Sequence, residues 1–255
     1  MSQEPIKVKL VGGLGNQLFI WATATAISKR TGLRFDLDAT QCTQWGYQLG
    51  DFGIEAKYLA NSPPDGLLPT RIVKYDSRLI NFLRLIRQEL RKFRIGSNHW
   101  ERSNSFDSSV FKIRAGKTLC GYFQSYKYFD NYEIEIRDIL VKNFIFAPEI
   151  EVVYKQFEGS KWVAIDFRRQ DYERFSHAFG LVRENYYQAA LTFLSSEFPN
   201  LKKIVFTDDV PQAKIAIPNC DGYIGVEQVK SSAARLILMS KADAIIGSNS
   251  TFGWW

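Results

Sequence analysis

Two consecutive arginines within residues 166–172 (DFRRQDY) carry the clearest chemical signal in this sequence. They follow a short apolar run, residues 162–165, which predicts a buried strand. A guanidinium group offers a planar, permanently charged fork of donors that suits a diphosphate. Side chains alternate in direction along a strand, so we expect Arg168 and Arg169 to point apart, one toward a ligand and the other into an ion pair with Asp171. A surface network of ion pairs is the competing interpretation.

A glycine-rich segment, residues 12–19 (GGLGNQLF), joins a predicted strand to a predicted helix. Gly13 and Gly15 allow a ligand to approach the backbone closely, and the free N–H groups at the start of a helix suit an anion. An ordinary tight turn would explain the glycines equally well. The amide side chains of Asn16 and Gln17 favour the binding of a hydroxylated ligand.

Two other polar segments follow later strands. The acids in residues 207–209 (TDD) could bind a metal, act as acid or base, or cap a helix, and capping is the expected role of Asp209. Residues 247–255 (GSNSTFGWW) place hydroxyl and N–H groups at a predicted helix start, where they either bind phosphate or cap the helix. Ligands bind at the carboxyl ends of strands in open α/β sheets. The four segments therefore predict a ligand cleft between two α/β domains.

The elements that would position these segments alternate between strands and helices in both halves of the chain, which favours two α/β units. We expect the boundary near Pro148, giving domains 1–150 and 151–255. In the first domain, strands are predicted over 6–11, 33–37 and 117–123, and helices over 18–29, 79–93 and 130–140. In the second, strands are predicted over 162–165, 203–206 and 244–247, and helices over 185–198, 210–216 and 231–239.

Composition excludes several classes of protein. With 255 residues, 45% hydrophobic and 24% charged, the chain has the composition of a globular protein with its own core. Its three cysteines lack the spacing of a zinc site or a disulfide framework, and its two histidines limit any histidine-based metal site. No apolar run is long enough to span a membrane, so we expect a cytoplasmic protein.

The positive charge is concentrated in one segment. Residues 71–94 hold eight Lys or Arg and two acids, which equals the whole net charge of +6. The rest of the chain is balanced, which argues against a nucleic-acid partner. The segment also carries an apolar stripe with helical spacing, whose default partner is the first domain. We expect its basic face to bind an anionic membrane peripherally, at the inner face of the cytoplasmic membrane.

Five segments, taken in order, resemble glycosyltransferase family 11, the α-1,2-fucosyltransferases of bacteria and animals. They are GGLGNQLF, GYFQSYKYF (121–129), RRxDY (168–172), FTDD (206–209) and LMS…NSTFGWW (238–255). The resemblance implies a B-type glycosyltransferase, with two Rossmann-like domains facing a central cleft. Domain 1–150 would lie on the acceptor side and domain 151–255 would bind the nucleotide sugar. It also implies an inverting mechanism, GDP-fucose as donor, a glycan of the bacterial surface as acceptor, and no required metal or other cofactor.

The resemblance further implies roles for individual residues. Arg168 would neutralise the donor diphosphate, and Asn16 would face the transferred sugar or the acceptor. Asp166 stands where the family usually has His, and Arg235 where it usually has Asp, at positions close to the guanine base. These two residues either pair with each other or read a different base. The expected catalytic residues are Arg168, Asn16 and Asp166, and the expected donor-binding residues are Gly13, Gly15, Arg169, Asp208, Arg235, Asn249, Ser250, Thr251 and Phe252.

Alternative functions remain open from the sequence. The same fold and mechanism could serve another sugar-nucleotide donor, as Asp166 and Arg235 allow. A metal-dependent A-type glycosyltransferase would use Asp36-Leu37-Asp38 as its DxD triplet. From a different class, the chain could be a non-catalytic sugar-nucleotide-binding protein.

Overall fold

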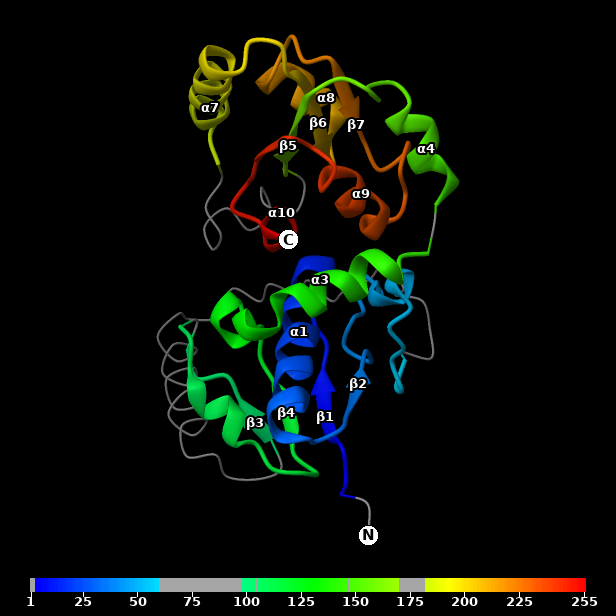
Figure 1. Ribbon diagram of the computed structural model, residues 1–255, viewed down its shortest axis with the longest axis vertical. Helices are drawn as coiled ribbons and strands as arrows, with labels where there is room; N and C mark the ends of the chain where they lie inside the picture. The colour runs from blue at the N-terminus through cyan, green and yellow to red at the C-terminus, as the bar shows by residue number, and fades with distance from the viewer. Residues whose placement is uncertain (1–2, 60–97, 104, 146, 170–181) are drawn as a thin grey trace, which may run out of the picture. The chain divides into compact units, whose positions relative to one another are not determined.

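The computed structural model describes residues 3–59, 98–103, 105–145, 147–169 and 182–255 (Figure 1). The chain divides into two compact units, Met1–Asn143 and Phe144–Trp255. The boundary expected after residue 150 falls inside helix α4 (Pro148–Tyr154). The basic segment 71–94, with its predicted helix, and Asp171 lie outside the described residues. Within the described ranges, no helix is long and apolar enough to cross a membrane.

The first unit contains a four-stranded parallel sheet in the order β2-β1-β4-β3. Its strands are β1 (Ile6–Lys9), β2 (Phe35–Asp38), β3 (Asn98–Trp100) and β4 (Thr118–Cys120). In the centre, Val8 pairs with Leu37 on one side and Leu119 on the other, and all three are buried. Because the strands are parallel, the segments that follow them meet at one edge of the sheet.

Helix α1 (Leu14–Thr31) runs alongside β1 and fills the core of the first unit (Figure 1). The predicted helix is confirmed, but it begins four residues earlier than its predicted start at Leu18, directly after the extended Gly13. It ends at Gly32, whose φ of 72° lets its N–H donate to the Ser28 carbonyl. The unit continues through short 3₁₀ turns and α3: η1 (Leu49–Phe52), η2 (Ser108–Lys112), η3 (Tyr126–Tyr128), η4 (Asp130–Tyr132) and α3 (Glu133–Lys142).

The second unit is also built on a four-stranded parallel sheet, in the order β7-β6-β5-β8. Its strands are β5 (Trp162–Phe167), β6 (Lys202–Thr207), β7 (Gly222–Ile224) and β8 (Ala244–Ile246). Besides α4, its helices are α7 (Glu184–Glu197), α8 (Val210–Ala216), α9 (Ser232–Met239) and α10 (Thr251–Trp254). These strands and helices confirm every element predicted for this half, including the helix start within residues 247–255, and add α4 and β7.

Each face of the second sheet has its own hydrophobic core. Trp162 and Ala164 of β5 pack with α4 and α9, whereas Val163, Ile165 and Phe167 pack with residues of α7 and α8. This alternation follows from the pleat of a strand buried on both faces. The same alternation sets the direction of the side chains at the end of β5. Asp166 follows Trp162 and Ala164 on the face of the sheet that packs with α4 and α9.

Candidate functional site

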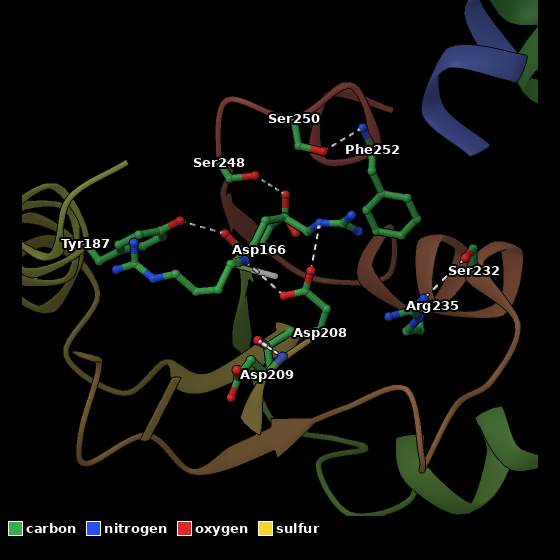
Figure 2. Close-up of polar contacts among 12 residues, drawn as sticks. Asp166, Tyr187, Asp208, Asp209, Ser232, Arg235, Ser248, Ser250 and Phe252 are labelled. Atoms are coloured by element: carbon green, nitrogen blue, oxygen red, sulfur yellow. Dashed lines mark hydrogen bonds and ion pairs between the residues drawn. The ribbon is translucent and has the colours of Figure 1, made fainter. Parts of the chain in front are cut away.

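Three of the polar segments expected from the sequence meet at one edge of the second unit, where β5, β6 and β8 end (Figure 2). Four charged residues form the centre of this edge, and we call them the arginine cluster: Asp166, Arg168, Asp208 and Arg235. Asp166 and Arg168 come from the end of β5, Asp208 from the end of β6, and Arg235 from α9. Segments separated by up to about 70 residues of sequence are thus brought together by parallel strand pairing.

The two consecutive arginines point to different faces, as strand alternation predicts. Nε of Arg168 lies 3.5 Å from Oδ2 of Asp208, within the arginine cluster. Arg169 turns toward α7, where its Nη2 lies 3.8 Å from Oε1 of Glu184 and its guanidinium stacks over the Phe167 ring. Of the pair, the structure therefore assigns Arg168 to the cluster. A role of Arg169 in donor binding stays a prediction.

Asp208 holds the end of β5 in place. Its Oδ1 accepts a hydrogen bond of 3.0 Å from the backbone N–H of Arg169, while its Oδ2 faces Arg168. The carboxylate thus fixes both the backbone and the side-chain direction of the arginine pair. This contact gives Asp208, in the segment 207–209, a positioning role that residue types alone did not reveal.

Asp166 is buried, with 1% of its surface exposed, and it faces the segment after β8. Its Oδ2 accepts a hydrogen bond of 2.5 Å from the Ser248 hydroxyl. A Cβ added at Gly253 would lie under 3.0 Å from the same oxygen, so only glycine fits there. Burial raises the pKa of the Asp166 carboxyl, although the Ser248 hydrogen bond and the charge of Arg168 act in the opposite direction.

Arg235 is 8% exposed and lies beside Phe252, with its guanidinium carbon 6.0 Å from the ring centroid (Figure 2). Its Nη2 donates to Ser232 Oγ at 3.2 Å, whereas its buried Nε has no hydrogen-bond partner among the described residues. Burial and the neighbouring charge of Arg168 lower the pKa of the guanidinium. Asp166 and Arg235, both within the described ranges, form no hydrogen bond or ion pair with each other. The charge of Asp166 nevertheless acts to raise the pKa of Arg235, so the two residues interact without a direct bond, and their pairing stays a prediction.

Two polar side chains near the cluster cap helices. Asp209 Oδ1 accepts from the N–H of Gln212 at 3.0 Å, which confirms the expected cap of α8. Ser250 Oγ accepts from the N–H of Phe252 at 3.0 Å and caps α10, the helix that begins at Thr251. Asn249 lies between the two serines of this loop. The loop is thus held in shape by its own hydroxyl groups.

Two adjacent tyrosines of α7 support the same edge. The Tyr187 hydroxyl donates to the Asp166 carbonyl at 3.1 Å, and the Tyr186 hydroxyl donates to the Gly247 carbonyl at 2.8 Å. They therefore tie the ends of β5 and β8 to one helix. Sequence reasoning missed both, because a tyrosine within an amphipathic helix is typical of a core position.

In the first unit, Asn16 lies in the first turn of α1, and its Oδ1 accepts from Gln124 Nε2 at 2.8 Å. Gln17 differs from the expectation that both amides face a ligand. Its Nε2 donates to the carbonyls of Gly12 and Gly46, each at 2.8 Å, and its Oε1 accepts from the N–H of Gln48 at 3.0 Å. Gln17 is buried and joins the glycine-rich turn to the loop after β2.

The acidic triplet of the A-type alternative is engaged in ion pairs. Asp36 Oδ2 lies 2.7 Å from Lys57 Nζ, and Asp38 Oδ2 lies 3.2 Å from Lys7 Nζ. Asp38 also accepts from the side chain and the N–H of Thr40. In the part of the chain that the structure describes, no three His, Cys, Asp or Glu residues gather in a metal-binding group.

Comparison with known proteins agrees with this geometry. The sequence profile of Glycosyl transferase family 11 matches residues 5–255. An alpha-1,2-colitosyltransferase of Escherichia coli is 25% identical, over 98% of this chain and 86% of the relative. The O-antigen biosynthesis glycosyltransferase WbnK of Escherichia coli is also 25% identical, over 96% of this chain and 87% of the relative. Among solved structures, the fucosyltransferase NodZ from Bradyrhizobium has a TM-score of 0.51 at 13% identity, covering 98% of this chain and 91% of that one.

Proposed function

This chain belongs to glycosyltransferase family 11, and from that premise we propose that it transfers fucose from GDP-fucose to a glycan hydroxyl, with inversion at the anomeric carbon. The enzyme class and the fold, a B-type glycosyltransferase with two Rossmann-like units, follow from the family and from the two parallel sheets. The observation that carries the proposal is the arginine cluster at the carboxyl edge of the second sheet. The names of the relatives favour a glycan of the bacterial cell surface as acceptor.

Arg168 supports departure of the nucleoside diphosphate. As the bond between the sugar and the β-phosphate breaks, negative charge grows on the phosphate oxygens. A guanidinium that is already fixed by Asp208 stabilises this charge without having to reorganise. The charge of Arg168 lowers the pKa of Arg235, which indicates that the two guanidinium groups lie close together. An anion with two phosphates would relieve that repulsion.

Arg235 supports guanine as the base. An arginine can donate two hydrogen bonds to O6 and N7 of guanine, whereas the Asp usual in the family would accept from N1–H and the exocyclic amine. Arg235 retains an unpartnered Nε among the described residues, and the Phe252 ring beside it offers an apolar face to a base. Asp166 is buried against Ser248, and we assign it to holding the loop rather than to contact with the base.

A second donor is favoured by one observation. One relative is named for colitose, which is fucose without its 3-hydroxyl group. The same diphosphate and base contacts would serve both sugars. Discrimination between fucose and colitose would depend on whether the site has a polar group that bonds to the 3-hydroxyl. A site built to bind the hydroxyl rejects the deoxy sugar strongly, because its own polar groups would lose their partner.

We also propose that the reaction needs no divalent metal. The two carboxylates of the possible DxD triplet are paired with lysines, and the guanidinium group of Arg168 supplies the positive charge that a metal would otherwise provide. Activity is therefore expected to persist in EDTA.

The proposed function is tested by release of nucleoside diphosphate from a panel of GDP-, UDP-, dTDP- and CDP-sugars, with and without a mixture of glycan acceptors. We expect GDP-fucose, or the corresponding colitose nucleotide, to be consumed fastest, in buffer containing EDTA. Preference for a UDP- or dTDP-sugar would overturn the donor assignment. Binding of GDP-sugars without any turnover would favour the non-catalytic alternative.

A further inference from the structure

We propose that a cavity at the carboxyl edge of the first sheet binds a neutral pyranose ring of the acceptor glycan, with Glu101 as its hydroxyl acceptor and Tyr122 as its aromatic wall. This inference rests on the proposed function, because it gives a binding site to the acceptor of that reaction. Nothing in the arginine cluster contributes to this cavity, because all its lining residues belong to the first unit.

The cavity has a volume of about 420 Å³, within the roughly 300–1,000 Å³ typical of small-molecule sites. Its walls come from the segments that end or follow all four strands of the first sheet. This is the edge at which open α/β sheets bind ligands. The lining residues that carry the argument are Lys9, Gln41, Trp100, Glu101, Ser103 and Tyr122.

Glu101 shapes the rim of the cavity. Its Oε2 accepts from the N–H of Tyr122 at 2.7 Å, and its Oε1 accepts from the N–H of Phe123 at 3.0 Å. Phe123 has a φ of 51°, in the left-handed region that a bulky residue rarely adopts. A Cβ at Gly121 would lie under 3.0 Å from Cβ of Glu101. The carboxylate thus holds a strained turn in place, and strain of this kind is found preferentially at functional sites.

The hydrogen bonds of this turn indicate which ligand the cavity suits. The two N–H groups that could bind a phosphate already donate to Glu101. The carboxylate itself lines the cavity and would repel an anion. Each carboxylate oxygen keeps a second lone pair, however, so Glu101 can accept a further bond from a hydroxyl group. Lys9 and Arg102 also line the cavity, and Nε of Arg102 lies 3.8 Å from Oδ2 of Asp107. The two positive charges are thus offset by Glu101 and Asp107, and this balance fits an uncharged, hydroxylated ligand better than a nucleotide.

Burial at the cavity strengthens this preference. Burial raises the pKa of the Glu101 carboxyl, while the two backbone hydrogen bonds act in the opposite direction. A partly desolvated carboxylate gains more from a hydroxyl donor than a fully solvated one does, because fewer water molecules compete for it. Gln41 and Ser103 supply further neutral donors and acceptors around the same space.

The aromatic residues provide the apolar component of a sugar site. Trp100 and Tyr122 both line the cavity, and Tyr122 is 47% exposed. A pyranose has a face of C–H groups that packs on an aromatic ring and a rim of hydroxyl groups that needs polar partners. Aromatic walls beside a carboxylate and neutral polar groups match both requirements.

The first experiment compares Tyr122→Ala with Tyr126→Ala. Tyr126 belongs to the same segment and is similarly exposed, at 54%, but it does not line the cavity. We expect Tyr122→Ala to raise the KM for acceptor about tenfold, as expected for loss of one aromatic contact. The KM for donor and the hydrolysis of donor by water should stay unchanged. An acceptor KM that changes equally in both variants, or in neither, would overturn the proposal.

The second experiment measures saccharide binding without turnover. Saturation-transfer NMR is recorded with the methyl β-glycosides of galactose, glucose and N-acetylglucosamine, using wild type, Tyr122→Ala, Tyr126→Ala and Glu101→Gln. At least one glycoside should give a signal that is lost in Tyr122→Ala and Glu101→Gln and retained in Tyr126→Ala. Binding of GDP, measured in parallel, should be the same in all four proteins.

The two experiments separate this inference from the proposed function. If the wild type binds a glycoside at this cavity but uses no GDP-sugar, the donor assignment fails and the saccharide site stands. If the enzyme transfers fucose normally but the glycoside signal survives in Tyr122→Ala, the saccharide site fails and the proposed function stands. A circular dichroism spectrum and a thermal unfolding midpoint equal to those of wild type show that Glu101→Gln has not unfolded the first unit, which binding of GDP to the second unit would not detect.

Discussion

The hydroxyl of Ser248 lies 2.5 Å from Oδ2 of Asp166 and donates a hydrogen bond to it, joining residues that are 82 positions apart in the chain. This bond connects the end of β5 to the loop after β8, the two segments that flank Arg168. Because Asp166 is buried, the bond forms where water competes little for either group. The position at which the family usually has His is thus occupied by a carboxylate that holds together the carboxyl edge of the second sheet.

Gly253→Ala tests how tightly this edge is packed. The new methyl group would overlap Oδ2 of Asp166, so we expect a loss of about 1–3 kcal/mol in the free energy of unfolding, as for other overpacked sites. Binding of GDP should weaken as well. Gly247→Ala is the matched control, since its Cβ would meet only the Gly253 carbonyl, at an ordinary 3.7 Å. Equal stability of the two variants in urea would contradict the packing described here.

The burial of Asp166 predicts a dependence of stability on pH. Its folded-state pKa is raised, so the folded protein binds more protons than the unfolded chain between the two pKa values. The resulting contribution to stability is fully present below the unfolded pKa and is lost as pH rises through the folded pKa. Asp166→Asn should therefore lose less stability than wild type as pH rises above 3.8, the ordinary pKa of the carboxyl, as measured by urea unfolding. Parallel curves for the two proteins would show that Asp166 titrates normally.

Tyr187→Phe tests the support from α7. Removal of the hydroxyl leaves the buried Asp166 carbonyl without this donor, which is expected to cost about 1–3 kcal/mol of stability. Tyr154→Phe serves as the control, because the Tyr154 ring packs edge-on against Phe157 in the other core of the same unit. Thermal unfolding of both variants checks the expectation, and similar midpoints would show that the hydrogen bond to Asp166 contributes little.

Arg235→Ala tests recognition of the base. Titration calorimetry with GDP, UDP, dTDP and CDP should show GDP bound most tightly by wild type. The variant should lose about 1–3 kcal/mol of its preference for GDP over the other three, the usual value of a bidentate contact to guanine. An equal loss of affinity for all four diphosphates would mean that Arg235 contacts phosphate instead.

The sequence predicted the sheets and the edge of the second unit because those features leave local signals. The apolar run before Asp166 indicated a buried strand, and strand alternation then separated Arg168 from Arg169. The three-residue strands β3 and β7 escaped prediction, since neither Asn98–Trp100 nor Gly222–Ile224 forms an apolar run. Local composition carries no signal for elements that are stabilised by their neighbours in the sheet.

The roles of several side chains were beyond prediction for a different reason. Gln17 and Asn16 are adjacent amides, yet their partners differ. The Gln17 side chain makes three hydrogen bonds to the backbone, whereas Asn16 accepts one from the Gln124 side chain. Residue type and spacing fix what a side chain can bond to, whereas its partners depend on loops brought together by folding. For the same reason, the sequence predicted a catalytic residue close to the base at Asp166, and did not predict that its carboxylate accepts a hydrogen bond from Ser248.

Loss of turnover in Arg168→Ala is the most direct test of the central claim, that Arg168 stabilises the departing diphosphate. Initial rates of GDP release from GDP-fucose, in the presence of acceptor, are compared for wild type, Arg168→Ala and Arg168→Lys, with folding checked by circular dichroism. We expect Arg168→Ala to lose two to three decades in rate, about 3–4 kcal/mol, with partial retention in Arg168→Lys. Near-normal turnover by a well-folded Arg168→Ala protein would contradict the account.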